Sequence, residues 1–270
     1  MTDFHYKDGI NFSVQKEKVS YPAAANDEYF GFEDKSFWFQ HRNLIIAEVL
    51  KKYQDRKCQV IDLGGGNGFV AQKIKSMGYP VTLVEAGGGV YNAKRRGIDN
   101  LYCVNLLDYQ SSESEVCVGL FDVVEHFSNS QVLFSKISEN IPGASILMMT
   151  VPAYKWLWSE EDDIAGHFTR YTKTRLKDEL NRNGYEILFC SYFFSLLILP
   201  IALFRSFPYQ LKKAFDKKIG ARLLSTESAH VGFFQKIIRA MLKWEIWCIS
   251  RGIAIPFGGS IVVIAKKKKV

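Results

Sequence analysis

The apolar residues of the chain gather in short runs. Several of these runs are separated by stretches in which apolar positions recur three and four residues apart. Short apolar runs bounded by turn signals are typical of buried strands, and the wider spacing is typical of helices. The pattern predicts strands at 58–63, 79–84, 101–110 (where the chain leaves the strand at Asn105), 116–120, 144–151, 185–191 and 260–265. It predicts helices at 37–53, 69–77, 131–140, 173–183 and 233–251. This alternation indicates an α/β protein with a doubly wound, mainly parallel sheet of seven strands, preceded by an irregular lead-in over residues 1–35.

The turn after the first expected strand contains Gly64, Gly65, Gly66 and Gly68, and Glu85 ends the second strand. Glycine adopts positive φ and lets a ligand approach the main chain closely. In a right-handed βαβ unit, the end of the second strand lies beside the turn after the first. Main-chain N–H groups facing a carboxylate suit a ligand with a polar or acidic end and a ribose.

Two cofactor interpretations compete for this turn. Gly66, Gly68 and Ala71 fit the dinucleotide spacing G-x-G-x-x-G/A, although a dehydrogenase would need a second catalytic domain after the sheet. The run Asp62-x-Gly64-x-Gly66-x-Gly68 instead resembles motif I of the class I S-adenosylmethionine-dependent methyltransferases. A glycine turn without a ligand is the third alternative. The resemblance implies S-adenosylmethionine as the cofactor, with Glu85 on its ribose hydroxyls.

The same resemblance implies further cofactor contacts after the third and fourth strands, at Asn105, Leu106 and Phe121. Asn105 stands where related sequences carry an acid that accepts the adenine amino group; its amide oxygen can accept the same hydrogen bond, and Asp108 is a rival. Arg42 lies among aromatic residues at the start of a helix, either reaching the cofactor carboxylate or facing solvent.

The segment FDVVEH, residues 121–126, resembles the motif after strand four of many methyltransferases, which borders the methyl donor. Asp122 is therefore expected near the reacting centre. Glu125 and His126 are interpreted as residues of a helix start, because acids favour helix N-termini.

A long loop rich in aromatic and charged residues follows strand five. Its V-P-A-x-x-W-L-W-S segment and its D-x-x-x-G-H-x-x-R-Y-T segment resemble one subgroup of class I methyltransferases, associated with glycan, lipid or small-molecule biosynthesis. The FWFQHRN segment near the start and IPFGGSIVVIAKK near the end resemble it too. In the resembled fold the last strand returns antiparallel beside strand six. The motif positions are Asp162, Gly166, His167, Arg170 and Tyr171.

His167 is the candidate general base, because a histidine with a near-neutral pKa suits proton removal from a hydroxyl or amine. Asp162 or Asp163 is close enough in sequence to orient it, and the alternative is a His–Asp pair that only locks the loop. The expected contacts with the substrate or with a lid come from Trp156, Trp158, Arg170 and Tyr171.

The chain divides into four expected parts: a lead-in and cap helix (1–57), a cofactor-binding core (58–192), a helical insertion (193–252), and a final strand with a basic tail (253–270). The apolar run in the insertion is too short to cross a bilayer once strand six and Pro200 are considered. Basic residues follow it, so the insertion is either a lid over the substrate or a peripheral membrane contact through 193–222.

Composition narrows the classes of function. The net charge of +7 and pI near 9.0 allow an anionic partner without requiring one. Five dispersed cysteines and no Cys/His spacing motif argue for free thiols and against a disulfide framework or a zinc site, and no metal is expected. The polar N-terminus lacks a secretory leader, which indicates a cytoplasmic protein.

These features predict a methyltransferase that moves a methyl group from S-adenosylmethionine to an oxygen or nitrogen of a small molecule, sugar or lipid-linked intermediate. The alternatives are a non-catalytic binding or scaffold protein on the same fold, and a nucleic-acid methylase, for which no basic-aromatic array is present.

Overall fold

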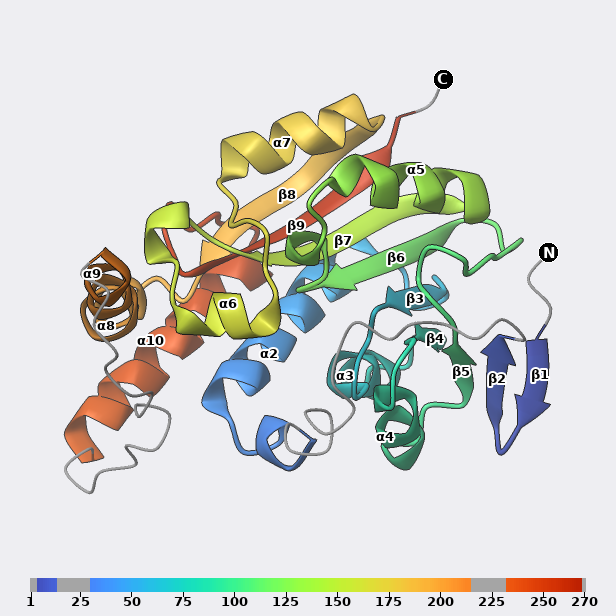
Figure 1. Ribbon diagram of the computed structural model, residues 1–270, viewed down its shortest axis with the longest axis horizontal. Helices are drawn as coiled ribbons and strands as arrows, with labels where there is room; N and C mark the ends of the chain where they lie inside the picture. Colours follow the sequence, from blue (N-terminus) through green and yellow to red (C-terminus); the bar gives the residue numbers. More distant parts are fainter. Residues whose placement is uncertain (1–3, 14–29, 215–231, 269–270) are drawn as a thin grey trace.

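One mixed sheet organises the fold (Figure 1). The computed structural model describes residues 4–13, 30–214 and 232–268, with only the main chain at 214 and 232–239. Within these residues the sheet has nine strands, in the order β1-β2-β5-β4-β3-β6-β7-β9-β8. Their bounds are β1 (Phe4–Lys7), β2 (Ile10–Ser13), β3 (Val60–Leu63), β4 (Val81–Val84), β5 (Asn100–Cys103), β6 (Val116–Phe121), β7 (Ala144–Pro152), β8 (Tyr185–Phe193) and β9 (Ser260–Lys267).

Strands β5, β4, β3, β6 and β7 run parallel, whereas β9 runs antiparallel to both of its neighbours, β7 and β8. The expected number of seven strands is wrong, and so is the irregular lead-in for the part that is described. The hairpin β1–β2 adds two strands and extends the sheet through parallel pairing of β2 with β5. Its turn, Asp8-Gly9, has positive φ at both residues, as a two-residue hairpin turn requires.

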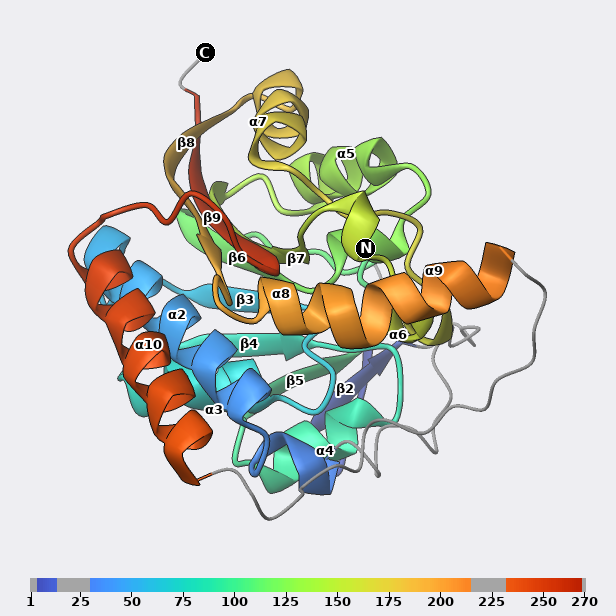
Figure 2. The ribbon, with the colours of Figure 1, turned by 90° about the vertical axis from the view of Figure 1, so that its left-hand side faces the viewer.

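Helices cover both faces of the sheet (Figures 1 and 2). One face carries α5 and α7, the other carries α2, α3 and α10, and α4 packs near the β4–β5 edge. The helices are α2 (Phe37–Tyr53), α3 (Phe69–Ser76), α4 (Gly89–Arg95), α5 (Ser130–Asn140), α6 (Glu160–Ala165), α7 (Lys173–Arg182), α8 (Ile198–Ile201), α9 (Phe207–Ala214) and α10 (Gly232–Ser250). Short turns of other helical types are η1 (Val124–His126), η2 (Lys155–Leu157) and η3 (Ala202–Ser206).

The core follows the two-residue period of the strands. In β6, Val118 and Leu120 contribute to the apolar layer with α5 and α7, whereas Cys117 and Phe121 contribute to the layer with α2, α3 and α10. Because both faces are covered, β6 is apolar at every position but the glycine, which explains why it reads as one continuous hydrophobic run.

The third strand is shorter than the run that predicts it. Strand β5 ends at Cys103, two residues before Asn105, the residue at which the sequence predicts that the chain leaves this strand. The side-chain oxygen of Asn105 accepts the N–H of Leu107 at 3.0 Å, and its carbonyl accepts the N–H of Asp108. This asparagine turn competes with the strand for the main-chain groups that follow it.

The insertion between β8 and β9 consists of α8, η3, α9 and α10, and residues 215–231 of the expected insertion lie outside the described part. Figure 2 shows α8 and α9 as one rod that crosses the molecule near the carboxyl edge of the sheet. No helix in the described residues is both long and apolar enough to span a membrane.

Candidate functional site

The candidate site forms where the parallel strands end. Strand β3 pairs with β4 on one side and with β6 on the other, and β6 pairs with β7. The segments that follow these four strands therefore meet at one edge of the sheet, the place where α/β proteins bind ligands. They are the glycine turn, the Glu85 segment, η1 and the long loop to α7.

The glycine turn is closely packed on three sides and open on the fourth. A Cβ added at Gly65 would lie 2.7 Å from Leu83, one at Gly68 would lie 2.8 Å from Ala93, and one at Gly64 would lie 3.0 Å from Val123. At Gly66, where φ is +53°, a Cβ would meet no atom of the described residues within 4 Å, although the Cβ position of Gly89 lies 2.7 Å from the carbonyl oxygen of Gly66. Among the described residues, the space on the Cβ side of Gly66 is thus the open part of the turn.

Glu85 lies across from this turn, as the βαβ geometry predicts. Its Oε2 accepts the N–H of Gly66 at 3.0 Å and its Oε1 accepts the N–H of Gly87 at 2.8 Å. Burial raises the pKa of this carboxyl, while the two N–H groups oppose the shift. Glu85 thereby fixes the position of the glycine turn relative to the segment after β4.

Asp62 lies beneath the turn and not in the open space above it. The carboxyl is buried, its Oδ2 is 2.8 Å from the Cβ position of Gly65, and burial raises its pKa to about 7. Its place indicates support of the turn from inside the protein. The expected direct contact with a cofactor does not follow from this position.

Arg42 and Asp122 form an ion pair at 2.5 Å, which was not expected from the sequence. Asp122 has a φ of +56° and also accepts the hydroxyl of Thr150 at 2.9 Å. The guanidinium lies over the ring of Phe39 at 5.0 Å. Arg42 therefore links α2 to the turn after β6, and this link positions Asp122 at the site.

The other three residues expected at the cofactor lie in different positions relative to the glycine turn. Leu106 lies against the glycine turn, with Cδ2 3.6 Å from the Cβ position of Gly64. Asn105 also lies near the edge, but its oxygen already accepts the N–H of Leu107. The ring of Phe121 packs in the core with α2 and α3, and its expected contact with the cofactor stays a prediction.

His167 is held by Asp162 in the loop after β7. Its Nδ1 lies 2.8 Å from Asp162 Oδ1, and Asp162 also closes a capping box at the start of α6 by accepting the N–H of Ser159. Burial alone would raise the pKa of Asp162, but the hydrogen bonds from His167 and Arg170 outweigh it and lower the pKa to about 2. Asp162 is thus an ionised residue that orients the His167 ring, and Nε2 points away from it.

Arg170 and Tyr171, two of the expected contacts with the substrate or with a lid, direct their side chains into the protein itself. Arg170 binds both oxygens of Asp162, each at 2.8 Å, and donates to the carbonyl of Ala153 at 3.0 Å, so its guanidinium serves the loop itself. Tyr171 is 0% exposed, in the core with α7, and its main chain pairs with Pro152 and Tyr154. Together they close the base of the loop.

The two tryptophans border an open groove of about 690 Å³. Trp156 stacks between Tyr154 and Phe207, and the indole N–H of Trp158 donates to Asp163 at 2.8 Å. Gln210 of α9 donates to the carbonyls of both tryptophans, which fastens the insertion to the loop. The lining residues are Tyr154, Lys155, Trp156, Trp158, Thr172 and Gln210.

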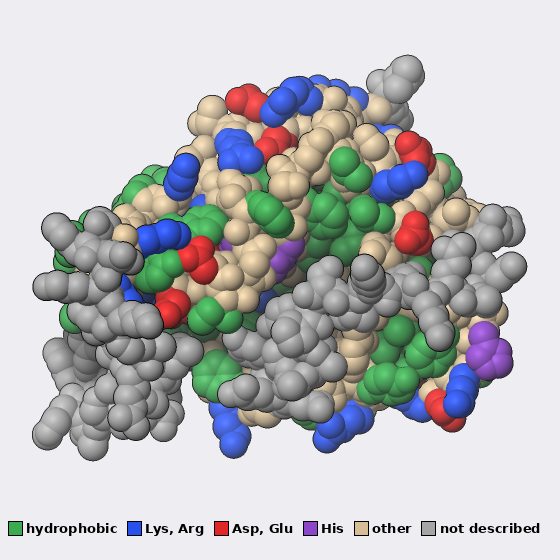
Figure 3. Space-filling view, in the orientation of Figure 1, with side chains coloured by type: hydrophobic (Ala, Val, Ile, Leu, Met, Phe, Trp, Pro, Cys, Tyr) green, Lys and Arg blue, Asp and Glu red, His purple; other side chains and the backbone are tan. Residues whose placement is uncertain are grey.

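Glu125 and His126 are part of the site, although the sequence indicates only a helix start. They form η1, whereas the helix begins later, at Ser130. Glu125 is fully buried, and burial together with Asp122 raises its pKa well above the usual range. Burial and the nearby His167 lower the pKa of His126 to about 4. Histidine surface is visible in the middle of the face in Figure 3, beside hydrophobic side chains.

The strand order and the glycine turn define a Rossmann-like methyltransferase fold. A family model for a methyltransferase domain matches residues 37–188, and the chain belongs to this family. No curated protein sequence gives a significant match to the chain.

Solved structures of similar fold agree with this assignment. A chain of the Haloferax volcanii complex with the Trm112 methyltransferase activator gives a TM-score of 0.56 at 10% identity, over 92% of this chain and 98% of that one. The plantazolicin methyltransferase BpumL, solved with SAH, gives 0.52 at 11% identity, over 91% and 90%. The [4+2]-cyclase SpnF gives 0.51 at 15% identity, over 87% and 84%. At these identities the likeness shows the fold alone.

Proposed function

We propose that the protein is an S-adenosylmethionine-dependent methyltransferase that methylates an oxygen or nitrogen of a small molecule, sugar or lipid-linked acceptor. The observation that carries the proposal is the open main chain at Gly66 with the Glu85 carboxylate across from it. The residues fit the cofactor: an unobstructed main chain suits its amino-acid end, and a carboxylate suits its ribose hydroxyls. The cofactor would supply the electrophilic methyl group.

We place the acceptor on the side of η1 and the loop after β7. Val123, in the turn after β6, packs against Gly64. The Nε2 atom of His167 lies 4.0 Å from the Oε1 atom of Glu125. Methyl transfer requires the acceptor atom in line with the methyl carbon and free of its proton. We assign control of that proton to His167, and orientation of His167 to Asp162.

The experiment that tests the reaction is transfer of labelled methyl from S-adenosylmethionine to a panel of hydroxyl- and amine-bearing sugars, phenols and lipid-linked glycans. Labelled product from at least one acceptor supports an enzyme. Cofactor binding without transfer to any of them favours the non-catalytic alternative. Label on RNA or DNA, with an affinity that falls steeply with salt, would favour the nucleic-acid methylase.

The open face of Gly66 yields a selective binding test. Gly66→Ala places a methyl group in the space above the turn, and crowding of this kind typically costs about 1–3 kcal/mol. We expect roughly 10–100-fold weaker binding of S-adenosylmethionine by calorimetry.

Gly78→Ala is the matched control, because Gly78 also has positive φ (+89°) and nothing within 4 Å of its Cβ position, but lies at the far end of α3. Equal affinities of the two variants for the cofactor would remove the assigned role of the turn.

A lipid-linked acceptor is favoured by the outer surface of the insertion. Leu199, Leu203, Phe204, Phe207 and Leu211 of α8, η3 and α9 are all exposed, and this rod is joined to the tryptophan groove through Gln210. An amphipathic segment with exposed apolar residues beside lysines binds at anionic membrane surfaces. We infer that this face meets the lipid in which such an acceptor is held.

Sedimentation with anionic vesicles tests this inference. The double variant Leu203→Glu, Phe204→Glu should lower the bound fraction by about tenfold, since it replaces two exposed apolar side chains, which would enter the lipid, by charges that anionic lipids repel. Val132→Glu on α5 is the control, because Val132 is also exposed but lies on another helix. Undiminished sedimentation of the double variant would contradict a lipid contact at this face.

A further inference from the structure

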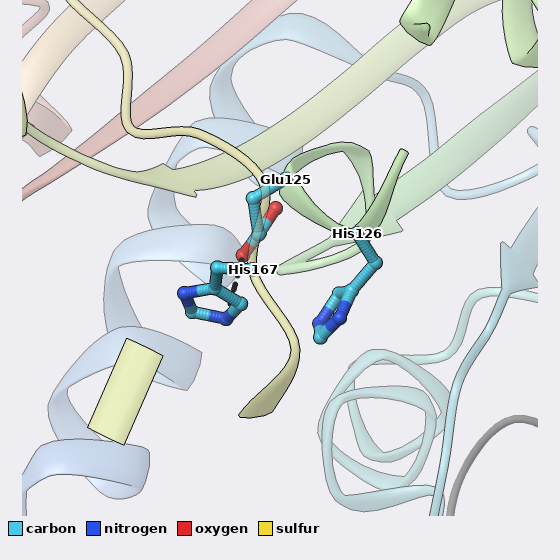
Figure 4. A group of neighbouring side chains, drawn as sticks. All are labelled: Glu125, His126 and His167. Atoms are coloured by element: carbon cyan, nitrogen blue, oxygen red, sulfur yellow. Dashed lines mark ion pairs between the residues drawn. The ribbon is translucent and has the colours of Figure 1, made fainter. Parts of the chain in front are cut away.

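Three side chains with metal-binding atoms meet at the candidate site (Figure 4). Glu125 and His126 come from η1 after β6, and His167 comes from the loop after α6. One ligand atom from each residue lies within 4.8 Å of the others. Ligands of a tetrahedral ion with bonds of about 2.1 Å stand roughly 3.4 Å apart, so small side-chain rotations close the set around a cation.

The carboxylate of Glu125 has unsatisfied binding capacity. Neither of its oxygens has a hydrogen-bond partner in another described residue, and the side chain is 0% exposed. A buried carboxylate without partners is costly, and paired or metal-bound carboxylates are the usual solutions. Arg42, whose charge acts on Glu125, is already paired with Asp122.

The surroundings of His167 match those of metal-bound histidines. A ligating histidine commonly donates its second ring N–H to a carboxylate, which fixes the ring and leaves the other nitrogen for the metal. Here Nδ1 lies 2.8 Å from Asp162 Oδ1, and Asp162 is itself held by both nitrogens of the Arg170 fork. Nε2 is the nitrogen on the Glu125 side.

The two ligand-bearing segments are joined directly. The N–H of Phe168 donates to the carbonyl of Glu125 at 2.8 Å, and the rings of His126 and His167 lie edge to face with centroids 4.8 Å apart. These contacts keep the three side chains near one another although they come from separate parts of the chain.

We propose that Glu125, His126 and His167 bind a divalent transition-metal ion. Two imidazoles and one carboxylate are a donor set that suits Zn²⁺ and similar ions better than Mg²⁺ or Ca²⁺, which prefer oxygen ligands alone. Three protein ligands leave at least one coordination position open, and both histidines are partly exposed to solvent, so a ligand can reach that position.

The proposal rests on the proposed methyl transfer and specifies how the acceptor is prepared. A hydroxyl bound at the open position becomes more acidic, because the cation stabilises the alkoxide or phenolate. The O–H proton passes to solvent, the oxygen electron pair forms the bond to the methyl carbon, and the carbon–sulfur bond breaks to give S-adenosylhomocysteine. His167 then acts on the acceptor proton indirectly, as a ligand of the ion.

Calorimetric titration of the full, tag-free chain with ZnCl₂ tests the site. We expect one Zn²⁺ per chain with wild-type protein and at least about 100-fold weaker binding with Glu125→Gln, since loss of even an outer partner commonly costs 10–100-fold. His5→Gln is the control, because His5 is exposed on β1 and should not alter binding. Circular dichroism and cofactor titration of each variant show whether the fold and the glycine turn are intact.

Absence of one-to-one Zn²⁺ binding, or equal binding by Glu125→Gln, would overturn the site, as would tighter binding of Mg²⁺ than of Zn²⁺. If Glu125→Gln does not fold, His126→Gln replaces it with the same expected loss. The outcomes are separable from failure of the proposed function: Zn²⁺ binding is measured without S-adenosylmethionine, and cofactor binding is measured without Zn²⁺.

Discussion

His167→Ala should lower kcat for methyl transfer by about 10²–10⁴-fold while leaving the affinity for S-adenosylmethionine unchanged. The ring is fixed by Asp162 through Nδ1, so Nε2 is the nitrogen that acts on the acceptor side, either on the proton itself or through a bound ion. The glycine turn and Glu85 contact neither ring nitrogen. Removal of the ring therefore affects the chemical step and not cofactor binding.

Steady-state rates with the acceptor identified from the panel, together with cofactor calorimetry, check this expectation. His5→Ala serves as the matched control on an exposed histidine of β1. A His167→Ala enzyme with an unimpaired kcat would remove His167 from the reaction and leave it as a structural partner of Asp162. A parallel loss of cofactor affinity would show instead that the loop supports the turn.

Glu245→Ala should lower the free energy of unfolding by about 3–5 kcal/mol, the usual result when one partner of a buried charged network is removed. Glu245 of α10 is 1% exposed and accepts the N–H groups of Phe194 and Ser195 at 3.0 and 2.6 Å. It also lies 2.8 Å from His41 Nε2 of α2. Without the carboxylate, these buried donors lose their shared acceptor.

The effect should depend on pH. Burial alone would raise the pKa of Glu245, but the hydrogen bonds from His41 and Ser195 outweigh it and lower the pKa below its usual range. A carboxyl with a lowered folded-state pKa stabilises the fold above its unfolded pKa, and this stability is lost as the pH falls through the folded value.

Denaturant unfolding of wild type and Glu245→Ala at pH 7 and at pH 3.5 measures both the size and the pH dependence. The difference between the two proteins should be full at pH 7 and smaller at pH 3.5. Glu139→Ala is a suitable control, because Glu139 is an exposed residue on α5 with only a surface ion pair. A change below 1 kcal/mol at pH 7 would show that α10 is not held by this network.

The central part of the fold could be predicted because its signals are local. The turn from Gly64 to Gly68, the periodic α3 and the return to Glu85 form one βαβ unit, and its handedness alone places Glu85 beside Gly66. The pair His167 and Asp162 could also be anticipated, since both lie in one loop. The continuous apolar run of β6 could be predicted as a buried strand, because its side chains enter the apolar layers on both faces of the sheet.

The hairpin β1–β2 was missed although a signal was present. Asp8-Gly9 is a favoured two-residue turn, but the strands around it are short, and β1 is largely exposed. The pairing of β2 with β5 depends on residues far away in the chain, such as Tyr102 opposite Asn11. Weak amphipathic strands at a sheet edge give little periodic pattern from which to predict them.

The site residues that sequence reasoning misplaced depend on long-range contacts. A motif gives the positions of Arg170 and Tyr171 but not the direction of their side chains, which turn toward Asp162 and the core. The pairs Arg42 with Asp122 and His41 with Glu245 are 80 and 204 residues apart. Glu125 could be recognised only once β6 and the loop after β7 were brought together.

Calorimetric titration of the wild-type chain with S-adenosylmethionine, repeated with S-adenosylhomocysteine as competitor, tests the central claim most directly. The open main chain at Gly66 and the Glu85 carboxylate predict one cofactor per chain, displaced by the demethylated product. A folded protein that takes up neither compound would contradict the assignment of this edge of the sheet as a methyl-donor site.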